Sequence, residues 1–507
     1  MSEKKIPWKR LYIFEILLLC GAACVLALGY ELWYDEAFSA AIVRHSFSDI
    51  VSYTASDVHP PLYYFILKLF SMIFGERWVV YHMVSVLPFI LMLLLVGNFC
   101  KKRYGYSAAL LTVLILASAP QMLCFALEVR MYSWAQLFVV LSAVTALSVL
   151  DQESWKKWMI LSLSNVLAAY LNYFAGAAVI LISLCLLLFL IFKREKKSVF
   201  HWIISMLVTF LLYLPWLPVF WKQLTDVRGG YWIEGIRAST LQEYANFVFG
   251  NNNDAQRYLL QIVFILAVCA AIVLWERGRQ DIPPVFFGMV FFGFVAAGIA
   301  LSVLITPVFV KRYIIIVLPL FWIALVSIFC RLKNKWCYIF LGLLGVLMFT
   351  VQYQQEFDHR VADKNISTFY LLQNEMEEGD VIYSTSPYLM AETAAYFSEV
   401  QQYIAGEELE GEAFQRWDEM INCEMVGDAA SFCEKRESKV WLLIYEDEEN
   451  TLETFEKYGY QIEDKEEQTL GWDGWWSDNI ELEVYYCTRS EERRVGKECR
   501  SRWSPYH

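Results

Sequence analysis

The stretch Leu32-Trp33-Tyr34-Asp35-Glu36-Ala37-Phe38 follows directly after the first long apolar segment of the chain. Two acidic residues therefore stand where a membrane-spanning helix would end and water would begin. A second unusual string, Asp57-Val58-His59-Pro60-Pro61-Leu62-Tyr63-Tyr64, follows after about twenty residues. We interpret the rest of the sequence as a scaffold that holds these groups at one face of a membrane.

The bulk composition is typical of a polytopic membrane protein. The 507 residues are 57% hydrophobic with a mean hydropathy of +0.39, and the apolar residues form runs long enough to span a bilayer. The formal net charge of −12 is unevenly distributed, because basic clusters separate the apolar runs and acidic residues follow them. The sequence lacks the basic face that binds nucleic acid, so we expect no nucleic-acid partner.

The 12 cysteines form no CxxC pair and no metal-ligand spacing, so no metal-binding residues are predicted. Most of them lie in apolar segments, where a cysteine acts as a small hydrophobic residue. Cys423 and Cys433 lie in the polar C-terminal part, and an exported protein could join them in a disulfide. Their spacing alone does not establish that bond.

The basic clusters predict the topology through the positive-inside rule. The N-terminus carries four basic residues before an apolar segment, so we expect it to be cytoplasmic. No small-residue cleavage site precedes Trp33, which indicates a retained anchor. Pro61–Phe74 is short and interrupted by Lys68, so we expect an interfacial or re-entrant helix. About eleven spans remain: Leu11–Tyr30, Val79–Cys100, Ala108–Leu127, Trp134–Leu150, Trp158–Tyr173, Phe174–Phe192, Phe200–Phe220, Tyr258–Trp275, Pro284–Ile305, Tyr313–Cys330 and Trp336–Val351.

This topology brings most of the unusual charged residues to the outer face. Charged groups at the edge of the hydrocarbon cost up to about 2.5–3.5 kcal/mol each if they enter it, so their convergence indicates a functional site. The residues concerned are Asp35, Glu36, Asp57, His59, Glu128, Arg130, Lys311 and Arg312.

The composition turns polar and acidic after Val351. We expect a transmembrane domain over residues 1–351 and a small extracytoplasmic α/β domain over 352–492. The last residues, 493–507, resemble a vector-derived tail. Strands are predicted at Asp380–Ser384, Lys439–Tyr445 and Glu481–Cys487, and helices at Ala391–Ser398, Glu412–Ile421 and Asn450–Glu456, with Asn450 as a candidate N-cap.

Each candidate site residue also has a purely structural interpretation. Asp35 and Glu36 could be a solvated helix end beside an aromatic belt, or could include a general base at the membrane surface. His59 could simply flank a proline-fixed helix start. Tyr64 and Lys68 lie four residues apart on one helical face. Together they could bind a lipid phosphate, or Lys68 could merely extend its ammonium group from the apolar region to the membrane surface.

Two further motifs carry charge at the predicted outer face. Glu128 and Arg130 lie at a predicted outer turn and could form a local ion pair that caps two helices. Lys311 and Arg312 open a later span from the outside, against the positive-inside rule. Topology signalling therefore explains them poorly, and an anionic ligand explains them better.

The ordered set of motifs resembles a known family. Trp-Tyr-Asp-Glu-Ala after the first span, His-Pro-Pro-Leu-Tyr-Tyr, Glu-x-Arg-Met-Tyr and Lys-Arg-Tyr before a Leu-Pro span resemble the GT-C glycosyltransferases over residues 10–350. The most similar branch comprises the bacterial relatives of the protein O-mannosyltransferases and the lipid A aminoarabinose transferases (glycosyltransferase family 39-like). The resemblance implies a polyprenyl-phosphate sugar donor and inversion at the anomeric carbon, with Asp35 matching the catalytic acid. His59 stands where the aminoarabinose transferases carry a lysine.

The chemistry agrees with these residue types. A glycosyl phosphate has a good leaving group, so it needs charge stabilisation, which Lys311, Arg312 or Arg130 could supply. One carboxylate then suffices as the base, whereas glycosidases usually need two. We expect an inverting glycosyltransferase of the bacterial plasma membrane, transferring a hexose or pentose to an extracytoplasmic protein, lipid or polysaccharide. Membrane lipid is the other expected partner. The sequence assigns no cofactor with certainty, and a divalent metal ion is compatible with the acidic residues.

The alternative is a transporter or flippase of lipid-linked sugars, since charges inside membranes also mark transport paths. A transporter would carry ionisable groups near the middle of the membrane and often an internal repeat. Here the predicted spans are nearly free of charge and the sequence shows no repeat. The transferase is therefore favoured.

The predicted topology is testable with reporter fusions in the full-length gene. Because every basic cluster but one falls on the same side, fusions after five basic residues should all report the cytoplasm: Arg103, Lys157, Lys197, Arg279 and Lys335. A fusion after Asp363 should report the outside. A cytoplasmic signal at Asp363 would disprove the placement of the charged residues at one outer face.

Overall fold

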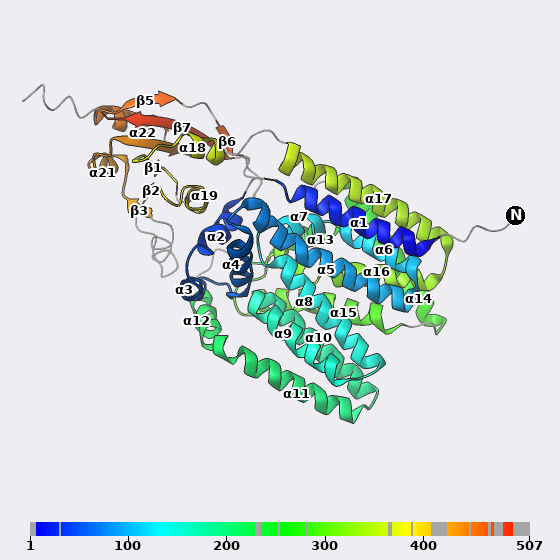
Figure 1. Ribbon diagram of the computed structural model, residues 1–507. Coiled ribbons are helices and arrows are strands. Elements are labelled where there is room, and N and C mark those ends of the chain that lie inside the picture. Colours follow the sequence, from blue (N-terminus) through cyan, green and yellow to red (C-terminus); the bar gives the residue numbers. More distant parts are fainter. Residues whose placement is uncertain are drawn as a thin grey trace, which may run out of the picture. The chain divides into compact units, whose positions relative to one another are not determined.

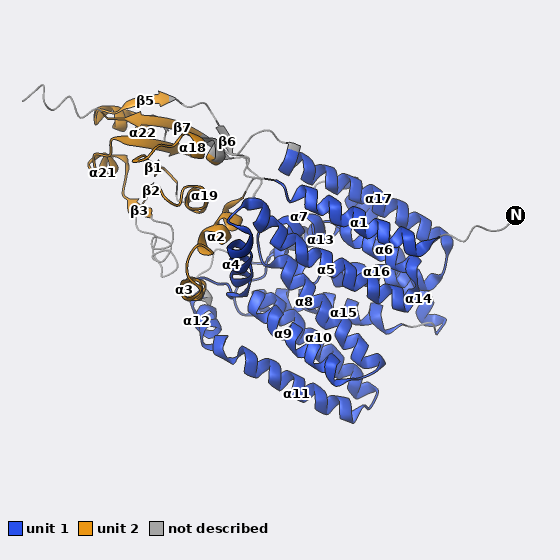
Figure 2. Cartoon of the chain, in the orientation of Figure 1, with its two compact units in different colours: residues 1–29, 57–362 blue, residues 30–56, 363–507 orange. Residues whose placement is uncertain are grey.

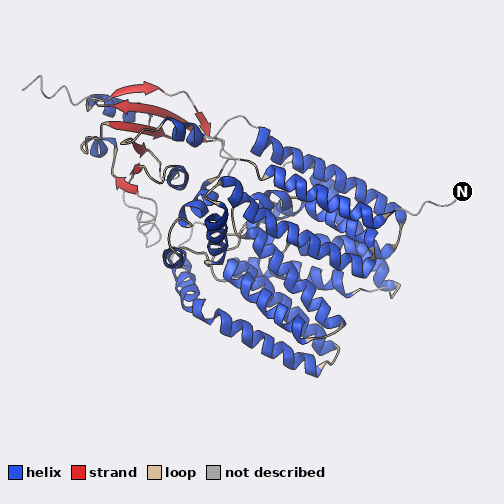
Figure 3. Ribbon diagram, in the orientation of Figure 1, coloured by secondary structure: helices blue, strands red, loops and turns tan. Residues whose placement is uncertain are grey.

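The computed structural model describes residues 7–29, 32–228, 233, 235–250, 254–278, 281–362, 368–386, 389–406, 423–445, 448–464, 468–470 and 480–489. The chain forms two compact units (Figure 2). The first contains residues 1–29 and 57–362, and the second contains residues 30–56 and 363–507. The strands belong to the second unit, whereas the described part of the first is helical (Figure 3).

Every predicted span has a helix at its place in the first unit (Figure 1). The helices are α1 (Trp8–Leu26), α4 (Leu62–Phe74), α5 (Trp78–Tyr104), α6 (Tyr106–Ser118), α7 (Met122–Leu127), α8 (Tyr132–Asp151), α9 (Trp155–Leu171), α10 (Tyr173–Phe192), α11 (Lys196–Tyr213), η1 (Leu214–Trp216), α12 (Leu217–Arg228), α13 (Ala238–Phe249), α14 (Asp254–Glu276), α15 (Ile282–Leu304), η2 (Lys311–Ile316), α16 (Leu318–Leu332), α17 (Lys335–Phe357) and η3 (Asp358–Ala362).

The lengths of these helices confirm a multi-pass membrane protein. In the described part of the chain, seven helical stretches are long and apolar enough to cross a membrane: α5, α8, α10, Lys196–Asp226, α14, α15 and α17. Three more apolar helices, α4, α6 and α16, are shorter. The short helix predicted at Pro61–Phe74 is present as α4, with 13 residues, and its interfacial placement stays a prediction. The number of about eleven crossings stays a prediction.

Prolines divide several predicted spans. α6 ends at Ser118, and Gln121 takes a left-handed conformation with φ 67° before α7 begins. α6 ends here because Pro120 lacks an N–H donor and disfavours helical geometry in the preceding Ala119, which is extended. In the same way, Pro215 and Pro218 separate α11 from α12 through η1. These interruptions place irregular backbone at the ends of long helices.

A ladder of uncharged polar side chains ties the central helices together. Ser142 of α8 donates a hydrogen bond to the Asn165 Oδ1 atom of α9 at 2.7 Å. The Asn165 amide donates to the Ser183 hydroxyl of α10 at 3.3 Å, and the Trp202 indole of α11 donates to the Ser183 carbonyl at 2.9 Å. Hydrogen bonds between apolar helices fix their relative register at little cost in solvation.

The described part of the second unit is an α/β arrangement with a seven-stranded sheet. Its strands are β1 (Val381–Ser384), β2 (Gln401–Ala405), β3 (Cys423–Val426), β4 (Lys439–Ile444), β5 (Gln461–Asp464), β6 (Gln468–Leu470) and β7 (Ile480–Thr488). The order is β3-β2-β1-β4-β7-β5, and β6 also pairs with β7. β1 to β4 are parallel, with Val381 beside Gln401 and Val440, whereas β7 runs antiparallel to β4.

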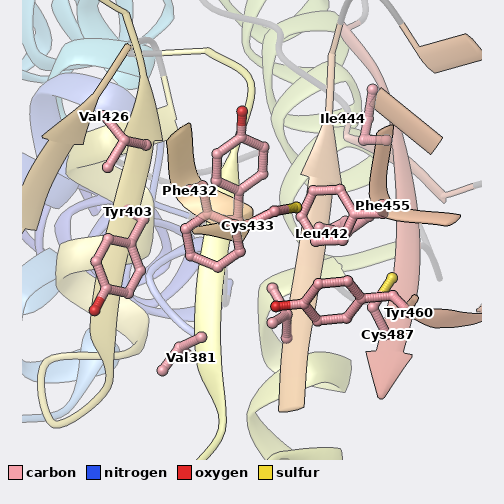
Figure 4. Close-up of a cluster of buried hydrophobic side chains, with 12 residues drawn as sticks. Val381, Tyr403, Val426, Phe432, Cys433, Leu442, Ile444, Phe455, Tyr460 and Cys487 are labelled. Atoms are coloured by element: carbon pink, nitrogen blue, oxygen red, sulfur yellow. The ribbon is translucent and has the colours of Figure 1, made fainter. Parts of the chain in front are cut away.

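The core of the second unit is aromatic (Figure 4). Phe432 of α21 (Ala429–Cys433) lies between Tyr383, Tyr403 and Phe455 of α22 (Glu448–Lys457), with ring centroids 4.7, 5.0 and 5.7 Å away. Alternate strand residues such as Val381 turn toward this cluster. The residues between them are also buried, as expected for parallel strands covered on both faces.

Residues 30–56 pack with this α/β unit, although the sequence placed them before the predicted boundary at 352. They form α2 (Tyr34–Ile42) and α3 (Phe47–Ser56), while α18 (Thr368–Glu375) and α19 (Met390–Tyr396) come from the C-terminal part. The Arg44 guanidinium donates to the carbonyls of Ala394 and Ala395 at 3.0 and 2.7 Å. The Leu32 N–H donates to the Tyr396 hydroxyl at 3.3 Å. The C-terminal end of α2 is thus hydrogen-bonded to α19, although Arg44 and Ala394 lie 350 residues apart in the sequence.

The predicted strands at 380–384, 439–445 and 481–487 correspond to β1, β4 and β7, and the predicted helix at 391–398 corresponds to α19. The prediction that Asn450 is an N-cap is wrong, because α22 begins at Glu448 and includes Asn450. Cys423 and Cys433 are free thiols. The predicted helix at 412–421 and the tail at 493–507 lie outside the described residues.

The packing of Gly298 in α15 gives a stability prediction. A Cβ atom at Gly298 would lie 2.6 Å from the ring of the buried Phe309, whereas one at Gly288 on the same helix meets nothing within 4 Å. Gly298→Ala should therefore destabilise the protein by about 1–3 kcal/mol through overpacking. Gly288→Ala, the matched control, should not destabilise it. The measurement is the thermal unfolding midpoint of the full chain in detergent. Equal midpoints for the two variants would contradict the packing.

Candidate functional site

A short polar turn precedes α4 in the first unit. The Asp57 carboxylate lies 2.8 Å from the His59 Nδ1 atom, and the His59 Nε2 atom lies 3.2 Å from an Nη atom of Arg130. A guanidinium can only donate hydrogen bonds, so Nε2 accepts and Nδ1–H donates to Asp57. The contacts therefore select one neutral tautomer of His59 and aim its lone pair at Arg130.

The carboxylate of Asp57 remains charged in this setting. Burial acts to raise the pKa of Asp57, but the hydrogen bonds from the His59 ring and the Val58 N–H, together with the charge of Arg130, outweigh it and hold that pKa below its ordinary value. The stabilising contribution of Asp57 is therefore fully present above the ordinary aspartate pKa of about 4. It is lost as the pH falls through the lowered value of the folded state.

Three residues that the sequence did not single out form a chain of hydrogen bonds to the backbone of this turn. The Gln223 amide of α12 donates to the Asp57 carbonyl, and the Tyr173 hydroxyl at the start of α10 donates to the Gln223 side-chain oxygen. The Trp216 indole of η1 donates to the Tyr173 hydroxyl at 2.9 Å. Asn172 caps α10, since its side chain accepts from the Phe174 N–H at 2.8 Å. The sequence signals were the N-cap type of Asn172 and the two prolines around Trp216.

The turn between α7 and α8 is buried although it is charged. Glu128 and Arg130 are only 3% and 2% exposed. The Arg130 N–H donates to the Glu128 carbonyl at 2.7 Å, and an Nη atom of Arg130 reaches the Tyr64 hydroxyl at 3.5 Å. Removing charges from water is costly unless they are paired and hydrogen-bonded. The structure thus joins the predicted residues His59, Tyr64 and Arg130 in one network.

The second basic motif reaches the same region. Glu128, Arg130 and Arg312 all lie within electrostatic range of the Tyr132 hydroxyl at the start of α8. Tyr313 of η2 stacks on Phe174 of α10, with centroids 4.2 Å apart. η2 therefore packs against the first turns of both α8 and α10.

The loop before η2 is anchored from two sides. The Ser302 hydroxyl accepts from the backbone N–H groups of Val308 and Phe309 at 3.2 and 2.9 Å. The Tyr244 hydroxyl of α13 donates to the Phe309 carbonyl at 2.5 Å. These bonds set the position at which Lys311 and Arg312 begin the 3₁₀ helix. Both residues are half-buried.

Lys68 lies one turn beyond Tyr64 on α4 and is half-buried, so the two share a helical face as predicted. The structure brings Asp57, His59, Tyr64 and Arg130 together through hydrogen bonds. Lys68 and Lys311 stay candidates by their positions on α4 and η2.

Asp35 and Glu36 belong to the second unit, in the first turn of α2. Glu36 is 1% exposed, and its carboxylate accepts from the Trp33 N–H at 3.3 Å, so it caps the helix. Asp35 is half-buried, and its carbonyl accepts from the Ser39 hydroxyl at 3.0 Å. The helix N-terminus favours negative charge at both positions. The described residues contain no cluster of three metal-ligating side chains.

Comparisons with known proteins agree with this architecture. Residues 58–219 match the family model described as dolichyl-phosphate-mannose-protein mannosyltransferase. The structure is similar to that of ArnT from Cupriavidus metallidurans in the apo state, with a TM-score of 0.66, 12% identity, and coverage of 94% of this chain and 97% of ArnT.

A second structure of Cupriavidus metallidurans ArnT, bound to undecaprenyl phosphate, matches with a TM-score of 0.60 and 13% identity, over 94% of this chain and 98% of ArnT. No curated protein matches the sequence. The chain therefore has the GT-C fold of ArnT, with a small C-terminal sheet region. The resemblance inferred from the ordered motifs is confirmed.

The tautomer of His59 is directly testable. In protein with ¹⁵N-labelled histidine, NMR should show Nδ1 protonated and Nε2 unprotonated at His59, assigned by loss of its signals in His59→Gln. Asp57→Leu removes the acceptor at 2.8 Å and should shift the population toward the Nε2–H tautomer. Asp57→Asn, the control, keeps an acceptor oxygen and should shift it less. An unchanged tautomer in Asp57→Leu would show that Asp57 does not orient the ring.

Proposed function

We propose that this protein is an inverting glycosyltransferase that moves a sugar from a polyprenyl-phosphate donor to an extracytoplasmic acceptor. The observation that carries the proposal is the buried Arg130, held by His59 and Tyr64 in a chain with the GT-C fold. A polyprenyl phosphate is an anionic group on an apolar chain. The undecaprenyl phosphate in the ArnT complex has that chemistry, which supports the choice of donor.

In this proposal the cationic residues stabilise the departing phosphate. The planar guanidinium of Arg130 matches phosphate oxygens geometrically, and its contacts with His59 and Tyr64 fix its plane before the donor binds. Arg312 and Lys311 add charge from η2. Preorganised donors of this kind lower the barrier because they need no reorganisation as charge develops. Lys68, one turn beyond Tyr64, meets the junction of phosphate and polyprenyl chain.

Asp35 acts as the general base. It takes the proton of the acceptor hydroxyl or amine while that oxygen or nitrogen forms a bond to the anomeric carbon. The bond from that carbon to the phosphate oxygen breaks, and its electron pair leaves with the polyprenyl phosphate. Asp35 is preferred over Glu36 because Glu36 is fully buried and already caps α2 through the Trp33 N–H. Attack from the face opposite the phosphate inverts the anomeric configuration.

The remaining partners follow from the predicted topology. The C-terminal unit is placed outside and the N-terminus in the cytoplasm, so the acceptor is an extracytoplasmic protein, lipid or polysaccharide. The transporter alternative is weakened by the polar side chains near the middle of α8, α9 and α10, which are Ser142, Asn165 and Ser183. None of these three ionises.

The test of the base uses the purified full-length chain in nanodiscs with a polyprenyl-phosphate sugar and a membrane extract as the source of acceptor. Asp35→Asn keeps the size of the side chain but removes its basic charge. Turnover, measured by mass spectrometry as released polyprenyl phosphate, should fall by about 10²–10⁴-fold. Binding of the polyprenyl phosphate, measured separately, should remain.

Glu36→Gln is the matched control, because a glutamine oxygen can still accept from the Trp33 N–H and preserve the cap. It should cost much less turnover than Asp35→Asn. Near wild-type turnover of Asp35→Asn on the same acceptor would refute the role of Asp35. A wild-type protein that moves the lipid-linked sugar between leaflets without releasing polyprenyl phosphate would refute the transferase itself.

A further inference from the structure

A groove of about 940 Å³ lies between α9 and α11 in the first unit. Its walls are apolar over two to three helical turns, and several of the side chains are exposed at 39–59%: Met159, Leu163, Ile204 and Val208. The floor contains a hydrogen bond between the hydroxyls of Ser162 and Ser205, 2.7 Å apart. Two small side chains let the helices approach at this level, and the larger residues beside them form the walls.

One end of the groove is polar, at the first turns of α9 and α11. The Glu153 carboxylate accepts from the Ser198 hydroxyl at 2.8 Å and lies 3.2 Å from the His201 ring and 3.5 Å from the Lys197 ammonium. The Ser198 hydrogen bond is the largest effect that lowers the pKa of Glu153, with smaller contributions from His201 and Lys197. Glu153 is thus a charged group that already accepts a hydrogen bond from Ser198 and pairs with Lys197.

The basic groups at this end exceed the acidic ones. Lys197 is 78% exposed, so most of its surface remains accessible beside Glu153. The Lys156 ammonium lies 5.9 Å from the centre of the Trp155 ring, and no carboxylate pairs with it among the described residues. The groove lining therefore offers two lysines against one engaged carboxylate, next to an exposed tryptophan of the kind found at membrane interfaces.

We propose that this groove binds one anionic glycerophospholipid. One of its acyl chains lies on Met159, Leu163 and Val208, and its phosphate meets Lys156 and Lys197. An apolar channel that ends in a net basic pocket between membrane helices selects a lipid with excess negative charge over a zwitterionic one. The volume is in the range of binding pockets that enclose a substantial part of one ligand.

This site is separate from the proposed catalytic one, because the two lie at opposite ends of the same helices. Tyr173 follows the end of α9, and Trp216 follows the end of α11, whereas the basic pocket lies at the starts of both. The 17 residues of α9 span about 25 Å at 1.5 Å per residue. The basic end carries clusters predicted to face the cytoplasm, so the lipid comes from the inner leaflet.

The experiment uses the full-length protein in detergent, mixed with phosphatidylglycerol and phosphatidylcholine of equal chain length, and native mass spectrometry counts retained lipids. The wild type should retain phosphatidylglycerol in preference to phosphatidylcholine. Lys156→Gln with Lys197→Gln should reduce that retention by about tenfold or more, since two charged contacts of the phosphate are lost. Lys335→Gln is the matched control, because Lys335 is a basic residue outside the groove lining and should retain wild-type binding.

A second variant tests the apolar part without touching charge. Val208→Trp fills the groove from its exposed side and should reduce retention of either lipid, whereas Val303→Trp, an exposed valine of α15 outside the groove lining, should not. Equal retention in the double lysine variant and the wild type would overturn the proposal. Equal retention of phosphatidylglycerol and phosphatidylcholine by the wild type would also overturn it. Displacement of phosphatidylglycerol by equimolar undecaprenyl phosphate would overturn it too, because that result would assign the groove to the donor lipid.

Discussion

The arrangement of the first unit depends on the burial of one guanidinium. Arg130 is 2% exposed, and a charge removed from water to that extent must be compensated by hydrogen bonds. His59 and Tyr64 supply contacts from the turn before α4 and from α4 itself, at 3.2 and 3.5 Å. The hydrogen bonds to Arg130 therefore help to fix the position of α4 relative to the turn between α7 and α8, together with the packing of α4 against α5 and α9.

The same requirement extends outward through the polar network. His59 must present Nε2 as an acceptor, so Asp57 must accept from Nδ1, and the backbone of Asp57 is in turn bound by Gln223 of α12. Tyr173 and Trp216 continue the chain to α10 and η1. Except for Gln223, which lies within α12, these residues lie at a helix end or in a break between helices.

The sequence predicted the helices well because each depends on a local property, the length of an apolar run. It also identified His59, Tyr64 and Arg130, because charged or proline-flanked residues stand out against such runs. It could not identify Gln223 or Tyr173, which are ordinary residues, and whose role rests on contacts across 166 and 50 positions. The packing of α2 on α19 escaped prediction for the same reason, since the partner of Arg44 is a pair of backbone carbonyls. A backbone carbonyl has no sequence signature.

Along α8, α9 and α10, the polar groups that bind the helices to one another lie at different positions from the ionisable groups that could take part in chemistry. Near their middles, Ser142, Asn165 and Ser183 bond to one another, and each hydrogen bond between these groups ends on a neutral partner. Neutral groups cost little to bury when they are paired, so they can tie helices at a depth where a charge would be prohibitive. At the ends of the same helices the residues are ionisable, with Arg130 and Tyr173 at one end and Glu153 and Lys156 at the other. A protein that passed charged substrates along these helices would need ionisable groups in between. One that recognises a lipid phosphate at the membrane surface needs them only at the ends, which is where these three helices carry them.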